Sequence, residues 1–307
     1  MSDLKFRPIT FDDKTAIQEH VYATVCRNCD LNFPNLMSWR FLYDTEVAFH
    51  DGWLLFRFKA NGHPAYLAPV GEGDMTPVIT ELLAETRRSE HSFLMLGVCE
   101  HSLAAIEAAM PGHFYAHADR SYTDYIYRRE ALATLAGKKL QPKRNHANRF
   151  VRLYPDHEYL PLAPGLFDEC MRLEAQWNSR QENGQGRIKS DDEQRSLAYV
   201  LDNWEHLGTT GLALRVGGRL VAFTYGAPIN RDTFGVCFEK ADTDYEGAYA
   251  AINREFASRI PEHYIYLNRE EDLGIEGLRR AKLSYQPEIL LHKYTVMEKH
   301  PFATEPV

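Results

Sequence analysis

A basic stretch in an otherwise acidic chain is the first place where residue types suggest a binding function. Residues 137–150 read GKKLQPKRNHANRF and contain no acid, whereas the 307-residue chain has a formal net charge of −8. The side chains that could hold an anion are Lys138, Lys139, Lys143, Arg144, Asn145, His146 and Asn148. Such a cluster suits the phosphates of a transfer RNA end, a nucleotide or an anionic lipid head group. A solvated basic linker is the alternative interpretation.

Three acids crowd the start of a helix expected in EKADTDYEGAYAAIN. They are Asp242, Asp244 and Glu246. Acids at a helix N-terminus stabilise the helix dipole, so simple capping is one interpretation. The functional interpretation is an acidic mouth that repels phosphate and receives an ammonium group, such as the α-amine of an aminoacyl donor or of an amine acceptor.

A third group of charges lies in EDLGIEGLRRAKLSYQP. Asp272, on the loop that leaves an expected strand, is the candidate for contact with an attacking amine. Arg280 stays protonated, so it could stabilise an oxyanion or a phosphate but could not donate a proton usefully. Lys282 follows Leu278 by four residues, which predicts a position near the inner face of a helix. The alternative is a surface helix with solvated charges.

The chemistry that these groups could serve is transfer from an activated ester. This reaction needs a positioned donor carbonyl and a neutral nucleophile, oxyanion donors and one proton acceptor. The motif GxSxG is absent, and we find no Ser–His–Asp arrangement by motif.

The elements that position these residues follow the same order twice along the chain. Each half reads as two leading helices, a hairpin, a helix, a strand, a short helix and a terminal strand. Asn61-Gly62 and Gly217-Gly218 predict tight hairpin turns, and EILLHKYTV at 288–296 predicts a single last strand. We therefore expect two α/β domains, 1–148 and 149–307, joined near the basic stretch.

Composition narrows the class of protein. The chain is 44% hydrophobic and 25% charged, as in globular proteins, and no apolar run approaches the length of a membrane span. The N-terminus lacks the apolar core of a signal peptide, so we expect a soluble, cytoplasmic protein. Five scattered cysteines do not resemble a disulfide framework, and the lone pair Cys26 and Cys29 gives no expectation of a metal. The acidic balance argues against general nucleic-acid binding, so any such contact is expected to be local.

The element order resembles the Gcn5-related N-acetyltransferase fold. Two such units in one chain resemble the peptidoglycan-bridge aminoacyl transferases and the C-terminal domain of phosphatidylglycerol lysyltransferase. The blocks NFPNLMSWR, GKKLQPKRNHANRF and EDLGIEGLRRAKLSYQP are similar to those of a bacterial family of unknown function grouped with that lysyltransferase domain. The resemblance implies an α/β (α+β) fold with two tandem acetyltransferase-like domains, each a mixed, mostly antiparallel sheet flanked by helices.

The resemblance also implies an acyl- or aminoacyltransferase. The donor would be aminoacyl-tRNA-like or otherwise anionic, with acyl-CoA as another candidate and no certain cofactor. The acceptor would be an amine or hydroxyl on a small molecule or a lipid. A CoA-dependent N-acetyltransferase and a non-catalytic ligand-binding module remain alternatives.

The acetyltransferase resemblance assigns further roles. In that fold a Q/R-x-x-G-x-G/A loop holds the pyrophosphate of coenzyme A at a helix start. Here Asp244 replaces the basic or amide residue, Gly247 matches the first glycine, and Tyr249 stands where a small residue belongs. This departure argues against ordinary acetyl-CoA chemistry. Tyr285 would be either the general acid or a packing aromatic. Spacing alone places Trp177 on one helix face with Glu174, where it would line a pocket or the core, and we expect Tyr249 and Tyr285 to be the other pocket residues.

Overall fold

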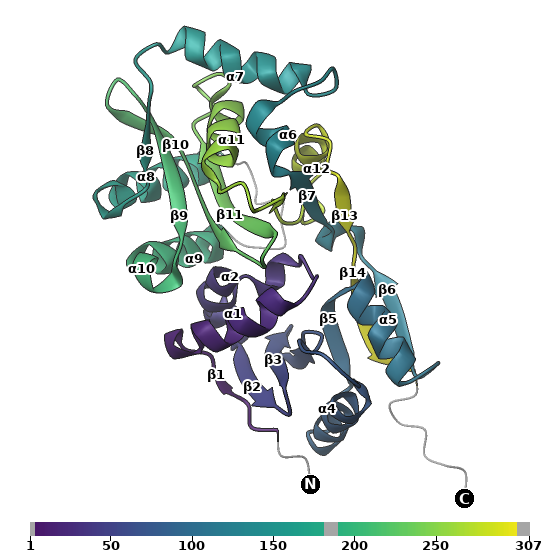
Figure 1. Cartoon of the computed structure of the whole chain (residues 1–307). Coiled ribbons are helices and arrows are strands. Elements are labelled where there is room, and N and C mark those ends of the chain that lie inside the picture. The colour runs from purple at the N-terminus through teal and green to yellow at the C-terminus, as the bar shows by residue number, and fades with distance from the viewer. Residues whose placement is uncertain (1–3, 181–189, 300–307) are drawn as a thin grey trace, which may run out of the picture.

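The computed structural model describes residues 4–180 and 190–299. Two seven-stranded sheets with helices packed against them form the framework of these residues (Figure 1). Most neighbouring strands are antiparallel; each sheet has one parallel pair, β4 with β5 and β11 with β12.

The first sheet has the order β1-β2-β3-β4-β5-β14-β6. Its strands are β1 (Arg7–Pro8), β2 (Glu46–His50), β3 (Trp53–Ala60), β4 (His63–Tyr66), β5 (Leu94–Cys99), β14 (Lys293–Glu298) and β6 (Phe114–Ala118). The second sheet, counted from its opposite edge, has the order β8-β9-β10-β11-β12-β7-β13. Its strands are β8 (Glu158–Pro161), β9 (Thr210–Val216), β10 (Arg219–Pro228), β11 (Thr233–Ala241), β12 (Tyr266–Asn268), β7 (Asp124–Arg128) and β13 (Ile289–Leu291).

The two sheets exchange one strand. β7 follows the first five strands and β6 along the chain, yet it lies between β12 and β13 of the second sheet. β14, the last strand among the described residues, lies between β5 and β6 of the first sheet. The prediction of one last strand over 288–296 was therefore wrong: the chain leaves β13 at His292 and enters β14 in the other sheet. The domain boundary at 148/149 stays a prediction, and each sheet contains strands from both sides of it.

Helices from both halves cover the sheets. Those before residue 160 are α1 (Lys14–Ala23), α2 (Phe33–Ser38), α3 (Arg40–Tyr43), α4 (Thr76–Arg88), α5 (Glu100–Ala109), α6 (Arg129–Thr134) and α7 (Gln141–Leu153). Those after it are α8 (Phe167–Arg180), α9 (Ser190–Asp202), α10 (Trp204–Leu207), α11 (Ala248–Arg259) and α12 (Glu276–Leu283). Short 3-10 turns lie at η1 (Phe11–Asp13), η2 (Cys29–Leu31), η3 (Arg120–Tyr122) and η4 (Pro164–Leu166).

Both hairpin turns form where the sequence predicts them. Asn61 and Gly62 have φ of 52° and 82°, and Gly217 and Gly218 have φ of 56° and 78°. Two successive residues with positive φ are typical of the type I′ turn, which glycine and asparagine tolerate best.

The basic stretch is helical rather than a linker. Most of it forms α7, which begins with Pro142 in its first turn and buries Ala147 and Phe150. Its other side chains are polar, apart from Pro142 and the exposed Val151 and Leu153. Because only two of its side chains are fully buried, the sequence lacks the repeated apolar stripe by which a helix is usually recognised.

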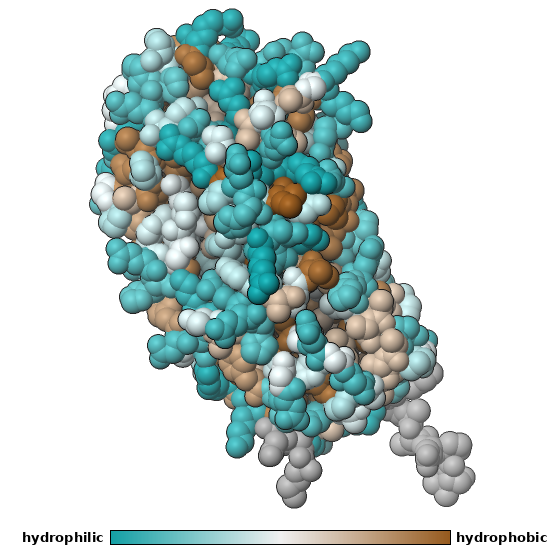
Figure 2. All heavy atoms as spheres, viewed as in Figure 1, coloured by the Kyte–Doolittle hydropathy of each residue, from teal (hydrophilic) through white to brown (hydrophobic). Residues whose placement is uncertain are grey.

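A shared apolar core joins the two halves. Ile17 and Met37, from α1 and α2, belong to the same buried cluster as Leu197, Val200 and Phe223 from the second half. In Figure 1, α1 and α2 lie between the first sheet and α9. Among the described residues, no helix is both long and apolar enough to cross a bilayer, and the face drawn in Figure 2 is mostly hydrophilic.

Candidate active site

Four consecutive charged residues follow β12 at the point where the second sheet opens. β11 pairs with β12 only through Thr233–Gly235 and then continues to Ala241 without it. Beyond this point the chain after β12 carries Arg269, Glu270, Glu271 and Asp272, which we call the 269–272 loop. Their side chains reach elements of both sheets, so the loop lies at the junction of the two halves.

Lys293 of β14 is the central cation of this junction. Its ammonium nitrogen lies 3.0 Å from Asp124 Oδ1 and 3.2 Å from Asp30 Oδ2, and it also binds the Glu271 carboxylate. The Lys293 side chain is only 3% exposed. Burial opposes its charge, but Asp124 and the other acids outweigh that effect and hold the pKa of Lys293 well above its ordinary value. Lys293 therefore stays protonated and joins strands of both sheets.

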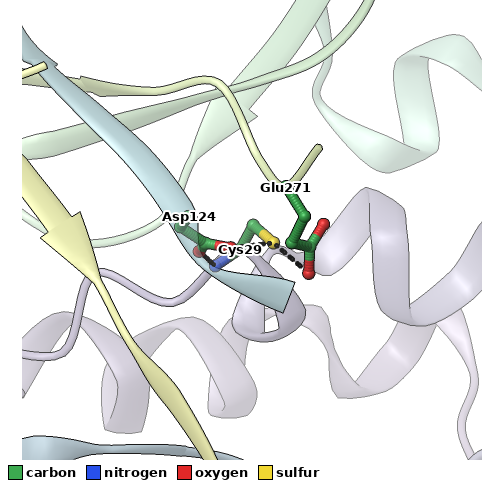
Figure 3. A group of neighbouring side chains, drawn as sticks. All are labelled: Cys29, Asp124 and Glu271. Atoms are coloured by element: carbon green, nitrogen blue, oxygen red, sulfur yellow. Dashed lines mark hydrogen bonds between the residues drawn. The ribbon is translucent and has the colours of Figure 1, made fainter. Parts of the chain in front are cut away.

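Cys29 lies beside this cation, with its Sγ 3.6 Å from Lys293 Nζ, and Figure 3 shows it next to Asp124 and Glu271. Its backbone N–H donates to Asp124 Oδ2 at 2.9 Å, and its Sγ lies 3.3 Å from Asp124 Oδ1 and 3.6 Å from Glu271 Oε1. Burial, and then Asp124, raise the pKa of the thiol well above its ordinary value, so Cys29 is a hydrogen-bond donor. The three groups are close enough to ligate a metal ion. The Lys293 ammonium already supplies a positive charge to them.

Glu270 is the carboxyl of the loop that is suited to proton transfer. Asn35 Nδ2 donates to its Oε1 at 2.7 Å, and its backbone has a φ of 57°, an unusual value for a residue other than glycine. Burial, and then the neighbouring Glu271 carboxylate, raise the pKa of Glu270 to about 8. A group that titrates near neutral pH can both accept and release a proton during a reaction.

Lys282 holds the loop in place. Its Nζ donates at 2.5 Å to the carbonyl oxygens of Arg269 and Glu271, which flank Glu270. Burial, and then the Arg269 charge, lower the pKa of Lys282 to about 8. The prediction that Lys282 faces inward is confirmed by its burial; its catalytic role stays a prediction.

Tyr285 connects α7 to the loop. The Arg269 guanidinium lies 4.8 Å from its ring centre, and Lys143 Nζ of α7 lies 4.3 Å from the same centre. Arg269 is also paired with Glu239 of β11 at 2.9 Å. Burial raises the pKa of Tyr285 to about 12, and burial, followed by Arg269, lowers that of Lys143. Tyr285 therefore packs between cations; its predicted role as a general acid stays a prediction.

Asp272 is fully engaged by protein donors. Tyr125 donates its hydroxyl at 2.5 Å, and Arg279 binds both carboxylate oxygens at 2.8 and 2.9 Å. Burial opposes ionisation, but Arg279 and Tyr125 outweigh it and lower the pKa of Asp272 to about 2. These contacts anchor α12 to β7, and contact with an attacking amine stays a prediction. Arg280 lies outside this network, 76% exposed and 3.9 Å from Glu276.

The acids before α11 all face arginines. Asp242 binds Arg180 at 2.9 Å and Arg219 at 3.1 Å, and Asp244 binds Arg180 at 2.7 Å. Glu246 binds Arg149 of α7 at 3.0 Å. An ammonium group would have to displace these arginines, so the acidic mouth stays a prediction without support from the geometry.

α7 covers the first turn of α11. Gly247 precedes that helix with a φ of 88°, and a Cβ placed on it would lie 2.4 Å from the carbonyl oxygen of His146 and 3.1 Å from Phe150. This is the position that the acetyltransferase resemblance assigns to a pyrophosphate. The close approach of α7 leaves no room for a side chain at Gly247, which disfavours a phosphate on the α11 backbone there.

The residues of the basic stretch divide into two groups. Arg144 donates to the carbonyl oxygen of Leu135 at 2.5 Å and so caps α6, while Asn148 accepts a hydrogen bond from Arg254 at 2.8 Å. These side chains and Lys143 have partners within the fold. Exposed side chains make up the other group: Lys138, Lys139, Asn145 and His146.

The predicted pocket aromatics Trp177 and Tyr249 do come together. Burial raises the pKa of the Tyr249 hydroxyl to about 12 and the neighbouring Trp177 side chain acts against this rise, while Lys240 Nζ lies 3.5 Å from the Trp177 ring centre. Lys240 also pairs with Glu174 at 3.4 Å. Burial, against the Lys240 charge, raises the pKa of Glu174 to about 7. The shared helix face of Glu174 and Trp177 is thereby confirmed.

The chain matches a known protein family over most of its length. Residues 25–297 match the family model described as phosphatidylglycerol lysyltransferase, C-terminal. The chain belongs to this family. A 52% identical solved structure, a conserved protein of unknown function from Bacteroides thetaiotaomicron VPI-5482, covers 96% of this chain and 100% of its own, with a TM-score of 0.92.

More distant structures show the fold alone. The C-terminal domain of a putative lysylphosphatidylglycerol synthetase from Agrobacterium fabrum is 14% identical, covers 94% of this chain and 92% of its own, and has a TM-score of 0.67. A tandem GNAT protein from the clavulanic acid biosynthesis pathway is 10% identical, covers 99% and 100%, and has a TM-score of 0.50. The predicted fold class, two tandem acetyltransferase-like units, is confirmed.

An uncharacterized protein of Mycoplasmoides gallisepticum is 23% identical over 178 residues. That match spans 57% of this chain and 56% of the relative, so the chain spans little more than half the length of the relative.

Sequence reasoning missed most of the polar residues that meet at the junction of the two halves in this lysyltransferase-family chain. They are Cys29, Asp30, Asp124, Glu270, Glu271 and Lys293. One signal was available: the run REED at 269–272, directly after the buried strand β12. Charges in such a position must either face water or find partners at once, and here they find them in the other half.

Proposed function

We propose that this chain transfers an activated acyl group of the aminoacyl type to an amine or hydroxyl acceptor, with the 269–272 loop at the reacting centre. The observation that carries the proposal is the position of Glu270. It follows β12 where the pairing with β11 ends, it accepts a hydrogen bond from Asn35, and its pKa is raised to about 8. The match of residues 25–297 to the lysyltransferase family supports the reaction class.

In the proposed step the acceptor attacks the ester carbonyl of the donor. A bond from the acceptor nitrogen or oxygen to that carbon forms, and the bond from the carbon to the donor oxygen breaks. Glu270 takes the acceptor proton and returns it to the leaving oxygen, so the step is balanced. Asn35 orients the carboxyl by its 2.7 Å hydrogen bond, and Lys282 fixes the backbone on either side of it.

The surface around α7 supports an anionic donor. This donor would not place a pyrophosphate on the start of α11, as coenzyme A does in the acetyltransferase fold. The close contact between α7 and Gly247 disfavours a pyrophosphate on α11. Lys138 and Lys139 are exposed at the approach to α7, as a polyanion such as an aminoacyl-tRNA would require. The acceptor is proposed as a small molecule or a lipid head group.

A transfer assay with matched variants tests the reaction. Bulk tRNA charged with radiolabelled amino acids is incubated with an acceptor panel that includes phosphatidylglycerol vesicles, and the label on each acceptor is counted. Glu270→Gln keeps the shape of the side chain but removes its basicity, and we expect at least a ~100-fold loss of kcat. Glu276→Gln, at a residue 83% exposed on α12, is the control and should be fully active. Full activity of Glu270→Gln would remove Glu270 from the mechanism.

A binding assay tests the donor separately. Affinity for charged tRNA is measured over a salt series for Lys138→Glu/Lys139→Glu and for the control Lys5→Glu/Lys59→Glu. The control changes the net charge equally at two exposed residues, one before β1 and one on β3. Losing two phosphate contacts should lower the salt slope by about 1.5 to 2 in the first variant alone. Lys143 and Arg144 are unsuitable for this test because both have structural contacts. Binding without transfer to any acceptor would favour a non-catalytic ligand-binding module.

A further inference from the structure

Two cysteines far apart in the sequence lie side by side at the end of β5, an inner strand of the first sheet. Cys26 and Cys99 are separated by 73 positions, and their sulfur atoms are 3.3 Å apart. Cys99 ends β5 and is buried, whereas Cys26 follows α1 and is partly exposed. A small oxidant therefore has access to the pair from the Cys26 side.

The surroundings of Cys99 stabilise a thiolate. Cys99 is the N-cap residue of α5, and its sulfur lies 3.3 Å from Ser102 Oγ. The hydrogen bond from Cys26, and then those from Ser102, outweigh burial and lower the pKa of Cys99 to about 6. The same contact raises the pKa of Cys26 well above its ordinary value. At neutral pH the pair thus consists of one thiolate and one thiol, the arrangement found in reactive cysteine pairs.

The other three cysteines are different. Burial raises the pKa of Cys170 to about 12 and that of Cys29 and Cys237 well above the ordinary value. These three thiols are therefore unreactive, and they serve as internal controls for the reactivity of Cys26 and Cys99.

We propose that Cys26 and Cys99 form a reversible disulfide when the protein meets a peroxide. The Cys99 thiolate attacks one peroxide oxygen, which gives a sulfenic acid and releases hydroxide. The Cys26 sulfur then attacks the Cys99 sulfur, the S–S bond forms, and the sulfenic oxygen leaves as water with the Cys26 proton. The thiolate and the thiol are oxidised together, and hydrogen peroxide is reduced to one hydroxide and one water; the hydroxide becomes a second water by taking up the proton that Cys99 released to solvent when it ionised.

The bond would fasten a segment that contributes to the junction of the two halves. Residues 26–30 carry Cys29 and Asp30, and Asn28 Nδ2 already donates to the carbonyl oxygen of Gly97 on β5 at 2.7 Å. Cys99 of β5 is also the residue that pairs directly with Lys293 of the neighbouring strand β14. The inference stands on this geometry and does not rest on the proposed transferase activity.

Peptide mapping of the wild-type protein tests the proposal without any variant. The protein is treated with increasing hydrogen peroxide, its remaining thiols are alkylated, and it is digested with trypsin without reduction. Cleavage at Arg27 separates Cys26 from Cys29, so the two can be distinguished. We expect a linked peptide pair containing Cys26 and Cys99, free thiols falling from five to three, and full reversal by dithiothreitol.

Variants identify the partners. Cys26→Ser and Cys99→Ser should each abolish the linked peptide, whereas Cys237→Ser should retain it. Overoxidation of Cys99 while Cys26 remains alkylatable would overturn the proposal, as would a linked peptide between any other two cysteines as the main product.

Discussion

Replacing Lys293 with methionine removes the cation of the junction while keeping a side chain of similar length. Asp124, Asp30 and Glu271 would then face one another without it. Lys293 is 3% exposed and Asp124 is fully buried, so solvent could not replace the lost charge. Removing one partner of a buried ion pair costs about 3–5 kcal/mol. At roughly 2 °C per kcal/mol for a chain of this size, Tm should fall by about 6–10 °C.

The stability lost in Lys293→Met should depend on pH in a definite direction. In the wild type the pKa of Lys293 is raised, so its contribution is fully present below its ordinary value of 10.5 and is lost only as pH rises through the higher folded value. Between pH 5 and 8 the wild-type ion pair is therefore constant. In the variant, protonation of a carboxylate relieves the repulsion, so the loss of stability should shrink as pH falls.

Urea unfolding at several pH values between 5 and 8 measures this effect. Lys299→Met, at an exposed residue beside the same strand, is the control and should stay within about 0.5 kcal/mol of the wild type. A loss below about 1 kcal/mol for Lys293→Met would refute the assignment of Lys293 as the required cation. A loss that grows toward acidic pH would refute it equally.

Three other substitutions test local features of the fold. Gly247→Ala should destabilise the protein by about 2 kcal/mol or more, seen as a lower Tm, because its φ is 88° and the new Cβ would meet α7. The lowered pKa of Asp272 gives the folded wild type about 2 kcal/mol of stability, which is lost as pH falls from about 4 to 2. Asp272→Asn should lack this contribution at neutral pH. Thermal unfolding between pH 7 and 2.5 measures the difference between the two proteins. Gly277→Ala, in α12 with open space around the added Cβ, should increase the free energy of unfolding by about 0.5–1 kcal/mol, seen as a higher urea midpoint. A lower midpoint would contradict a helical conformation at Gly277.

Local signals in the sequence predicted the local structure well. Glycine and asparagine pairs fixed both hairpin turns because positive φ is open to few other residues. The single last strand was wrong because alternating side chains indicate extended backbone but not the sheet that it joins. Only His292 separates two strands that pair with different sheets.

The site was only partly predictable. Asp272 and Lys282 were found in the correct loop and helix. Glu270 and Glu271 were overlooked because a run of acids reads as solvated surface, and their burial depends on Asn35 and Lys293 from distant elements. Such partners follow from the tertiary fold and not from spacing along the chain.

The exchanged strands make each half depend on the far end of the chain. On a ribosome, β7 is synthesised before any strand of the sheet that receives it, and the place between β5 and β6 stays unfilled until β14 has been made. A nascent chain therefore carries unpaired strand edges for most of its synthesis, and such edges invite association with other chains. The second sheet receives β13 only just before β14 is made for the first sheet, so the two sheets should assemble late and nearly together.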